Sequence, residues 1–187
     1  MSMSRPFKFY TPIRVRFNET DLQGHVNFGQ YYFYFDVGVT EYFEAIGYDH
    51  ETMLTDQTDL LFAESHCNYE ASAKWPERLR VYVRVGHLGR RSIRFEFEVR
   101  AEADERLIAS GHIVAVTAHS DTFEPQLIPE RLRQAIIVYQ GELPTTHPTL
   151  NPDGDSVESQ DKQVDIVMEA GLESFPSSDP PAWTLGR

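Results

Sequence analysis

The sequence is poor in cysteine, in basic residues and in long apolar runs, and each shortage excludes a class of protein. Its 187 residues include one cysteine, Cys67, so no disulfide forms within the chain and a reducing cytoplasm is the expected compartment. No apolar run is long enough to span a membrane, and the first six residues lack the apolar core of a signal peptide. No group of residues has the spacing of a structural zinc site, so we expect no metal.

Basic residues are outnumbered, and the imbalance is uneven. The chain has 29 acidic and 17 basic residues, a net charge of -12. Residues 141–187 contribute -7, from nine acids and two bases, and residues 1–140 contribute -5, from 20 acids and 15 bases. A broad basic face is therefore absent, and nucleic acid is not an expected partner.

Composition also divides the chain into two parts. Residues 1–140 have the balanced composition of a globular domain. Residues 141–187 hold six of the eleven prolines among Thr, Ser, Asp and Gly, and we interpret them as an acidic, Pro-rich extension, partly disordered. Within it, residues 141–157 are interpreted as a linker and 157–170 as a weak helix. The end, with Phe175 and Trp183 among prolines, is either a disordered tail or a segment that docks on a groove.

Hydrophobic periodicity predicts an α+β domain. Alternation predicts strands at residues 8–17, 60–71, 79–87, 92–101 and 106–118. Helices are predicted at 27–46, at a short turn around 50–56, and at 129–139, which Pro129 opens. The aromatic-rich helix 27–46 is expected to be buried on most sides and to end at Gly47. Because the turns between the later strands are short, these strands should be antiparallel neighbours. A single sheet wrapped around a central helix satisfies this order.

The loop before the long helix contains the most informative residues. Asp21 lies six residues before Asn27, which we predict to be the N-cap, with Gln30 closing a capping box. The loop and the first helical turn would then present a carboxylate beside free backbone N–H groups. Acyl transfer requires this combination of a base or nucleophile with an anion-stabilising helix terminus.

The residues of this loop also resemble a family signature. The motif Thr20-Asp21-Leu22-Gln23-Gly24-His25-Val26-Asn27, followed by Tyr31, is similar to that of hotdog-fold acyl-CoA thioesterases, in particular the 4-hydroxybenzoyl-CoA thioesterase type. The resemblance covers about residues 8–138 and leaves out the extension. It implies a five-stranded antiparallel sheet wrapped around a long helix, and no cofactor beyond the coenzyme A of the substrate. It also implies a homodimer or homotetramer with active sites at the subunit interface.

The resemblance assigns roles to several residues. Asp21, the second acid of Glu19-Thr20-Asp21, corresponds to the catalytic acid of the family. The backbone amide of Phe28 corresponds to the group that polarises the thioester carbonyl. Some branches carry a histidine at the Phe28 position, and this chain does not. Other branches take the acid from elsewhere on the fold, and this makes Glu64 the alternative acid; its structural alternative, which the sequence favours, is a strand residue that faces solvent or a subunit contact.

The remaining candidates are assigned to substrate binding, each with a structural alternative. Arg90 and Arg91 lie in a turn where relatives hold the phosphates of coenzyme A, but they also suit an ordinary charged hairpin. Four more candidates come from the loop and the helix, where they could instead serve as cap, loop or core residues: Gly24, His25, Asn27 and Tyr31.

The function predicted from these residues is hydrolysis of an acyl-CoA to a carboxylic acid and free coenzyme A. Asp21 would act as general base or as nucleophile, and the helix N-terminus as oxyanion donor. A hotdog hydratase and a non-catalytic acyl-CoA binder are the alternatives. The sequence fixes neither the acyl group nor the choice between coenzyme A and carrier-protein thioesters.

Overall fold

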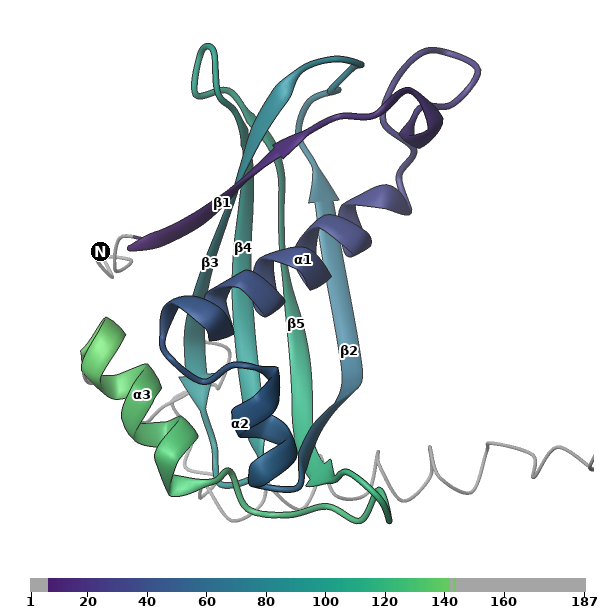
Figure 1. The fold of residues 1–187 in the computed structure, drawn as a ribbon. Helices are drawn as coiled ribbons and strands as arrows, with labels where there is room; N and C mark the ends of the chain where they lie inside the picture. The colour runs from purple at the N-terminus through teal and green to yellow at the C-terminus, as the bar shows by residue number, and fades with distance from the viewer. Residues whose placement is uncertain (1–6, 142, 144–187) are drawn as a thin grey trace, which may run out of the picture. The chain divides into compact units, whose positions relative to one another are not determined.

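The computed structural model describes residues 7–141 and residue 143. Figure 1 shows one antiparallel sheet with a long helix lying across one of its faces. In chain order the elements are β1 (Phe9–Arg14), a short 3-10 turn (Phe17–Glu19), α1 (Gln30–Ala45), α2 (His50–Thr55), β2 (Thr58–Tyr69), β3 (Arg78–Leu88), β4 (Ser92–Ala101), β5 (Leu107–His119) and α3 (Glu130–Gln140). The predicted α+β class is confirmed.

The strands lie in the order β1-β3-β4-β5-β2, and every neighbouring pair is antiparallel. The consecutive strands β3, β4 and β5 are neighbours, as their short turns predict. β2 is an edge strand, because it pairs with β5 on one side only. The positions of β1 and β2 at opposite edges could not be predicted from the sequence, because they depend on how the connection through α1 crosses the sheet.

Strand alternation gives the sheet one apolar and one polar face. The inner face of β4 buries Phe95 and Phe97, and the ring of Phe35 from α1 stacks on Phe97 at a centroid distance of 4.4 Å. The intervening residues, such as Arg94 and Glu96, lie on the outer face, opposite α1. The core therefore sits between α1 and the inner face of the sheet.

The first predicted strand is too long. β1 ends at Arg14, and Phe17, the last residue of the predicted strand, is 74% exposed. The Val15 N–H still donates to the Glu77 carbonyl, just before β3, at 2.9 Å. After Val15 the chain leaves the sheet. The carboxylate of Glu19 then accepts the Arg16 N–H at 2.7 Å and closes the 3-10 turn.

The predicted start of α1 is also wrong. The helix begins at Gln30 with Gly29 at the N-cap position, and no side chain caps it. Asn27 instead closes a turn before the helix, in which its carbonyl accepts the Gln30 N–H at 2.9 Å. The Asn27–Gln30 capping box is therefore absent, because the chain reaches the helix through a turn. Gly47 ends the helix as predicted, with a φ of 73°.

α1 is buried on the side that faces the sheet and exposed on part of the other. Seven of its residues are buried, among them Phe35 and Gly38. Phe33 is 66% exposed and Val37 is 43% exposed. The expectation of a helix buried on most sides is therefore met only toward the sheet.

α3 covers the part of β3 that extends beyond β1. β1 pairs with β3 only as far as Val83. Beyond that point the side-chain amide of Gln140 accepts the Val85 N–H (2.8 Å) and donates to the Val85 carbonyl (3.1 Å). One side chain thus bonds the backbone of β3 as a neighbouring strand would. The predictions made for residues 144–187 lie outside the described residues.

Candidate active site

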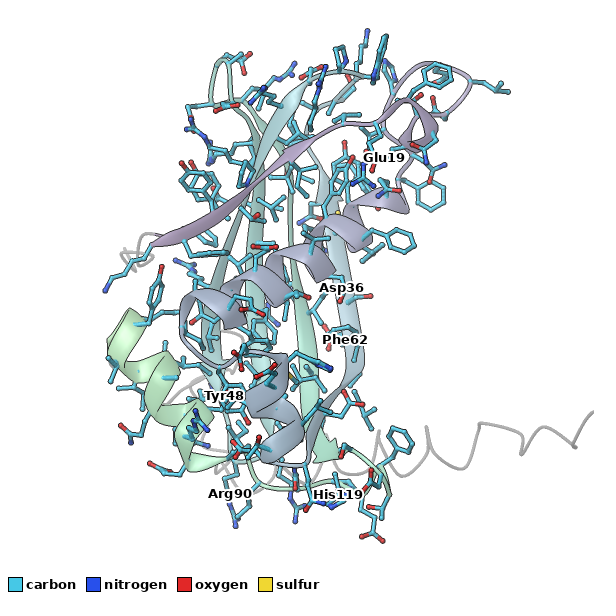
Figure 2. The ribbon with its side chains drawn as sticks, viewed as in Figure 1. Glu19, Asp36, Tyr48, Phe62, Arg90 and His119 are labelled. Carbon is cyan, nitrogen blue, oxygen red and sulfur yellow. The ribbon has the colours of Figure 1, made fainter. Side chains whose placement is uncertain are left out.

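The loop between the 3-10 turn and α1 is anchored by the buried carboxylate of Glu19. Glu19 is 9% exposed, and its Oε2 accepts the Tyr34 hydroxyl at 2.8 Å in addition to the Arg16 N–H. Burial and this hydrogen bond raise the pKa of Tyr34 above its ordinary value. The Glu19 carbonyl also accepts the Asn27 N–H at 2.9 Å. Glu19, labelled in Figure 2, therefore holds both ends of the loop against α1.

Asp21 lies exposed at the start of a tight turn. Its Oδ1 accepts the N–H groups of Gln23 (2.8 Å) and His25 (3.2 Å). The backbone closes the same turn through two further bonds, from Asp21 N–H to the His25 carbonyl (2.8 Å) and from Gly24 N–H to the Asp21 carbonyl (3.0 Å). Within residues 7–141, Oδ2 accepts no hydrogen bond. The carboxylate is therefore oriented through Oδ1, and Oδ2 remains available to a ligand or a water molecule.

The predicted loop residues keep this turn in shape. Gly24 has a φ of 76°, a conformation that other residues adopt at a cost, so its loop role follows from its lack of a side chain. His25 contributes its backbone to the turn and forms a bridge with Lys74 just before β3. Tyr31 is 3% exposed and packs against Tyr34 and Tyr69, so in this chain it belongs to the core.

Hydrogen bonding just before α1 leaves the Phe28 N–H available. The Asn27 carbonyl accepts from Gln30, the Asn27 side chain accepts the Gly29 N–H (2.9 Å), and the Phe28 carbonyl accepts the Tyr69 hydroxyl (3.1 Å). The Gly29 carbonyl accepts the Tyr32 N–H at 3.2 Å. Among the described residues, the Phe28 N–H donates to no other group. A free N–H that directly precedes a helix N-terminus suits a developing negative charge.

The two arginines do not lie near Asp21. Arg90 and Arg91 are in the turn between β3 and β4, whereas the Asp21 loop lies beside the start of β3. β3 has 11 residues, so the two ends are separated by about 35 Å at the usual strand rise. Figure 2 shows this separation, with Glu19 at one end of the sheet and Arg90 at the other. Arg90 is exposed and Arg91 is half-buried.

Glu64 lies on the outer face of the sheet, across from α1. Its side chain is 61% exposed and pairs with His112 Nε2 at 2.7 Å. The His112 ring in turn lies against His66, with ring centroids 5.4 Å apart. This chain therefore does not bring the alternative acid together with Asp21 and Phe28. Cys67, the next residue but two, faces inward and packs against the core.

Two residues of the site have no role in the sequence-based prediction. Glu19 is the first acid of the triplet, but nothing in its sequence position reveals that it is buried. Tyr69 is the last residue of β2, 41 residues from Phe28, and only the folding of β2 beside α1 brings its hydroxyl to the Phe28 carbonyl.

Two kinds of feature are missing from the described part of the chain. No three His, Cys, Asp or Glu residues within it lie close enough together to hold a metal ion. None of its helices is both long and apolar enough to cross a bilayer.

Comparison with known proteins defines the class. Residues 15–136 match the family model of the thioesterase-like superfamily, and the chain belongs to that superfamily. The arrangement of the sheet and α1 is the hotdog fold, as the sequence resemblance implies.

The individual proteins that resemble this chain do so at modest sequence identity. The chain is similar to the PA5185 protein from Pseudomonas aeruginosa strain PAO1, with 30% identity, coverage of 74% of this chain and 95% of that one, and a TM-score of 0.65. DHNA-CoA thioesterase from Staphylococcus aureus shares the fold, with 22% identity, coverage of 72% and 95%, and a TM-score of 0.64. The uncharacterized protein YsmA of Bacillus subtilis (strain 168) is 31% identical over 91 residues, which are 49% of this chain and 60% of that protein.

Proposed function

We propose that this protein hydrolyses acyl-CoA thioesters, with Asp21 as the acting acid and the Phe28 N–H as the oxyanion donor. The observation that carries the proposal is the hydrogen bonding of one loop, which leaves a carboxylate oxygen of Asp21 and the N–H of Phe28 available. The superfamily, and the thioesterase with the same fold, support hydrolysis of a thioester.

The chemistry needs only these two groups and water. As general base, Asp21 takes a proton from a water molecule as that water attacks the thioester carbon, and the thiolate of coenzyme A leaves. As nucleophile, its carboxylate oxygen attacks the same carbon and expels the thiolate of coenzyme A, which gives a mixed anhydride; water then hydrolyses the anhydride to the free acid and regenerates Asp21. On both routes the Phe28 N–H stabilises the negative charge on the carbonyl oxygen, a contribution typically worth about 10²–10³ in rate.

The test is thiol release from a panel of short, long and aromatic acyl-CoAs. We expect the wild type to turn over at least one member, and Asp21→Ala and Asp21→Asn to lower kcat by at least about a hundredfold. Asp104→Asn is the matched control, because Asp104 is also exposed and also accepts the N–H of the residue two positions later. Binding of acyl-CoA without turnover would instead identify a non-catalytic binder. Turnover that survives both Asp21 variants and falls in Glu64→Gln would move the chemistry to Glu64.

We further propose that the site is completed by a second copy of the chain. Arg90 and Asp21 of one chain lie at opposite ends of β3. A coenzyme A whose thioester lies at the Asp21 loop therefore cannot also contact Arg90 of the same chain. Antiparallel pairing of two β2 edges would place the Arg90 end of one copy beside the Asp21 loop of the other, and would cover Phe33 and Val37. The open edge of β2 and these exposed apolar side chains support a homodimer.

Mixing two inactive variants tests this assembly. An equal mixture of Asp21→Asn and Arg90→Glu chains, assayed below KM after subunit exchange, contains sites with Asp21 from one variant and Arg90 from the other. We expect recovery of about a quarter of wild-type activity from random pairing. Activity no higher than the mean of the separate variants would show that each site uses a single chain.

A further inference from the structure

Both polar atoms of one peptide bond at the start of α1 are held by side chains. The Phe28–Gly29 peptide offers its carbonyl to the Tyr69 hydroxyl (3.1 Å) and its N–H to the Asn27 side chain (2.9 Å). The preceding peptide, Asn27–Phe28, contains the free N–H and is held through its carbonyl by the Gln30 N–H. Since the two peptide planes meet at the α-carbon of Phe28, fixing both fixes the direction of that N–H.

Tyr69 is itself held in place. Its ring packs edge-to-face on Tyr31, with centroids 5.5 Å apart, and Tyr31 is buried. Its backbone is paired with Ala109 at the end of β2. Burial, together with the neighbouring Cys67, raises the pKa of Tyr69 to about 12. The phenol therefore keeps its proton, and can donate it to a carbonyl, throughout the neutral range.

We propose that Tyr69 is a positioning residue of the reaction: its hydroxyl locks the Phe28–Gly29 peptide and so directs the Phe28 N–H toward the thioester oxygen. This inference rests on the proposed function. Tyr69 touches no reacting atom; it acts through the peptide that it holds. A donor fixed before the reaction stabilises the oxyanion without reorganising, whereas a donor on a rotating peptide loses that advantage.

The variant Tyr69→Phe removes the hydroxyl and keeps the ring against Tyr31. We expect kcat to fall about tenfold, the rate equivalent of roughly one hydrogen bond, while KM stays within about twofold. Tyr10→Phe is the matched control, because Tyr10 is similarly exposed (46% against 48%) but lies on β1. A tenfold loss of kcat in Tyr69→Phe alone supports the proposal. A kcat within about twofold of wild type would overturn it.

A spectroscopic measurement separates this inference from the proposed function. Phe28–Gly29 is the one Phe-Gly pair in the sequence, so labelling with ¹³C-carbonyl Phe and ¹⁵N Gly gives a single correlation for this peptide. In Tyr69→Phe we expect the carbonyl resonance to move upfield as its hydrogen bond is lost. An unmoved resonance would show that Tyr69 does not hold the peptide. Absence of turnover by the wild type would overturn the proposed function and the catalytic part of this inference, and the resonance would still decide whether Tyr69 holds the peptide.

Discussion

At the scale of single residues, Gly24 and Gly47 form a natural pair for comparison. Their φ angles are 76° and 73°, and a Cβ on either would meet no atom within 4 Å. Alanine at either position should therefore lower the free energy of unfolding by a similar amount, about 1–2 kcal/mol from the left-handed backbone alone. Gly24 closes the Asp21 turn, whereas Gly47 ends α1.

Only Gly24→Ala should also lower kcat/KM, because the strained turn would no longer present Asp21 in the same orientation. Urea unfolding of both variants and thiol release by the folded proteins measure the two effects. Equal losses of activity in both variants would show that the effect comes from stability and not from the turn.

Sequence reasoning at this scale predicted features that follow from local chain geometry, whereas the catalytic role of Asp21 stays a prediction. The loop acid, the conformation of Gly24 and the helix end at Gly47 are all visible in short stretches of sequence. The predicted helix start is wrong because the Asn27 side chain can accept either the Gln30 N–H, as an N-cap would, or the Gly29 N–H. In the fold it accepts the Gly29 N–H. Tyr69 could not be found, since its bond to Phe28 joins residues that only the tertiary fold brings together.

At the scale of elements, the contact between α1 and β3 depends on Gly38. A Cβ at this position would lie 2.8 Å from a methyl group of Val83 and 3.2 Å from one of Val81. Helix propensity favours Ala over Gly by about 1 kcal/mol, but overpacking a close contact costs about 1–3 kcal/mol. We expect Gly38→Ala to destabilise the protein by about 1 kcal/mol in urea unfolding, the difference between these two effects.

Adding Val83→Ala to Gly38→Ala makes room for the new methyl group. The double variant should then be more stable than the sum of the two single changes predicts. Strict additivity would show that the contact relaxes elsewhere. From sequence alone, Gly38 counts only as a weak point of the helix, because its packing role depends on how closely α1 approaches the sheet.

Strand and helix identities were predictable because periodicity and turn residues are local signals. β4 has the predicted bounds, and the other later strands differ by one or two residues at each end. The order of the strands and the exposure of Phe33 and Val37 were not predictable, because they depend on which elements meet.

At the scale of the whole molecule, buried tyrosines predict how stability changes in alkaline solution. Burial raises the pKa of Tyr31 from its ordinary value of 10.0 to about 12. Below pH 10 the phenol is protonated in both the folded and unfolded states, so stability is unaffected. Between pH 10 and 12 the unfolded chain loses the proton while the folded chain keeps it, and stability must fall.

The urea midpoint should therefore decrease from pH 10 to pH 12, and Tyr31→Phe should show a smaller decrease. Unfolding followed by circular dichroism at fixed pH values measures this slope. A wild-type midpoint that stays constant over this range, or an equal decrease in the variant, would contradict the assignment.

The two edges of the sheet are finished differently, and this bears on how many chains can join. The β1 edge is six residues long and contains Pro12, which has no N–H to offer, and Gln140 already bonds the exposed backbone of β3 beyond it. The β2 edge runs for 12 residues. A molecule that can add strands at both edges can polymerise into a fibre, whereas one with a single receptive edge is satisfied by one partner. In the proposed pairing through β2, the bonds from Gln140 to the Val85 backbone would keep a further strand from adding beyond β1, so the assembly would close at two copies.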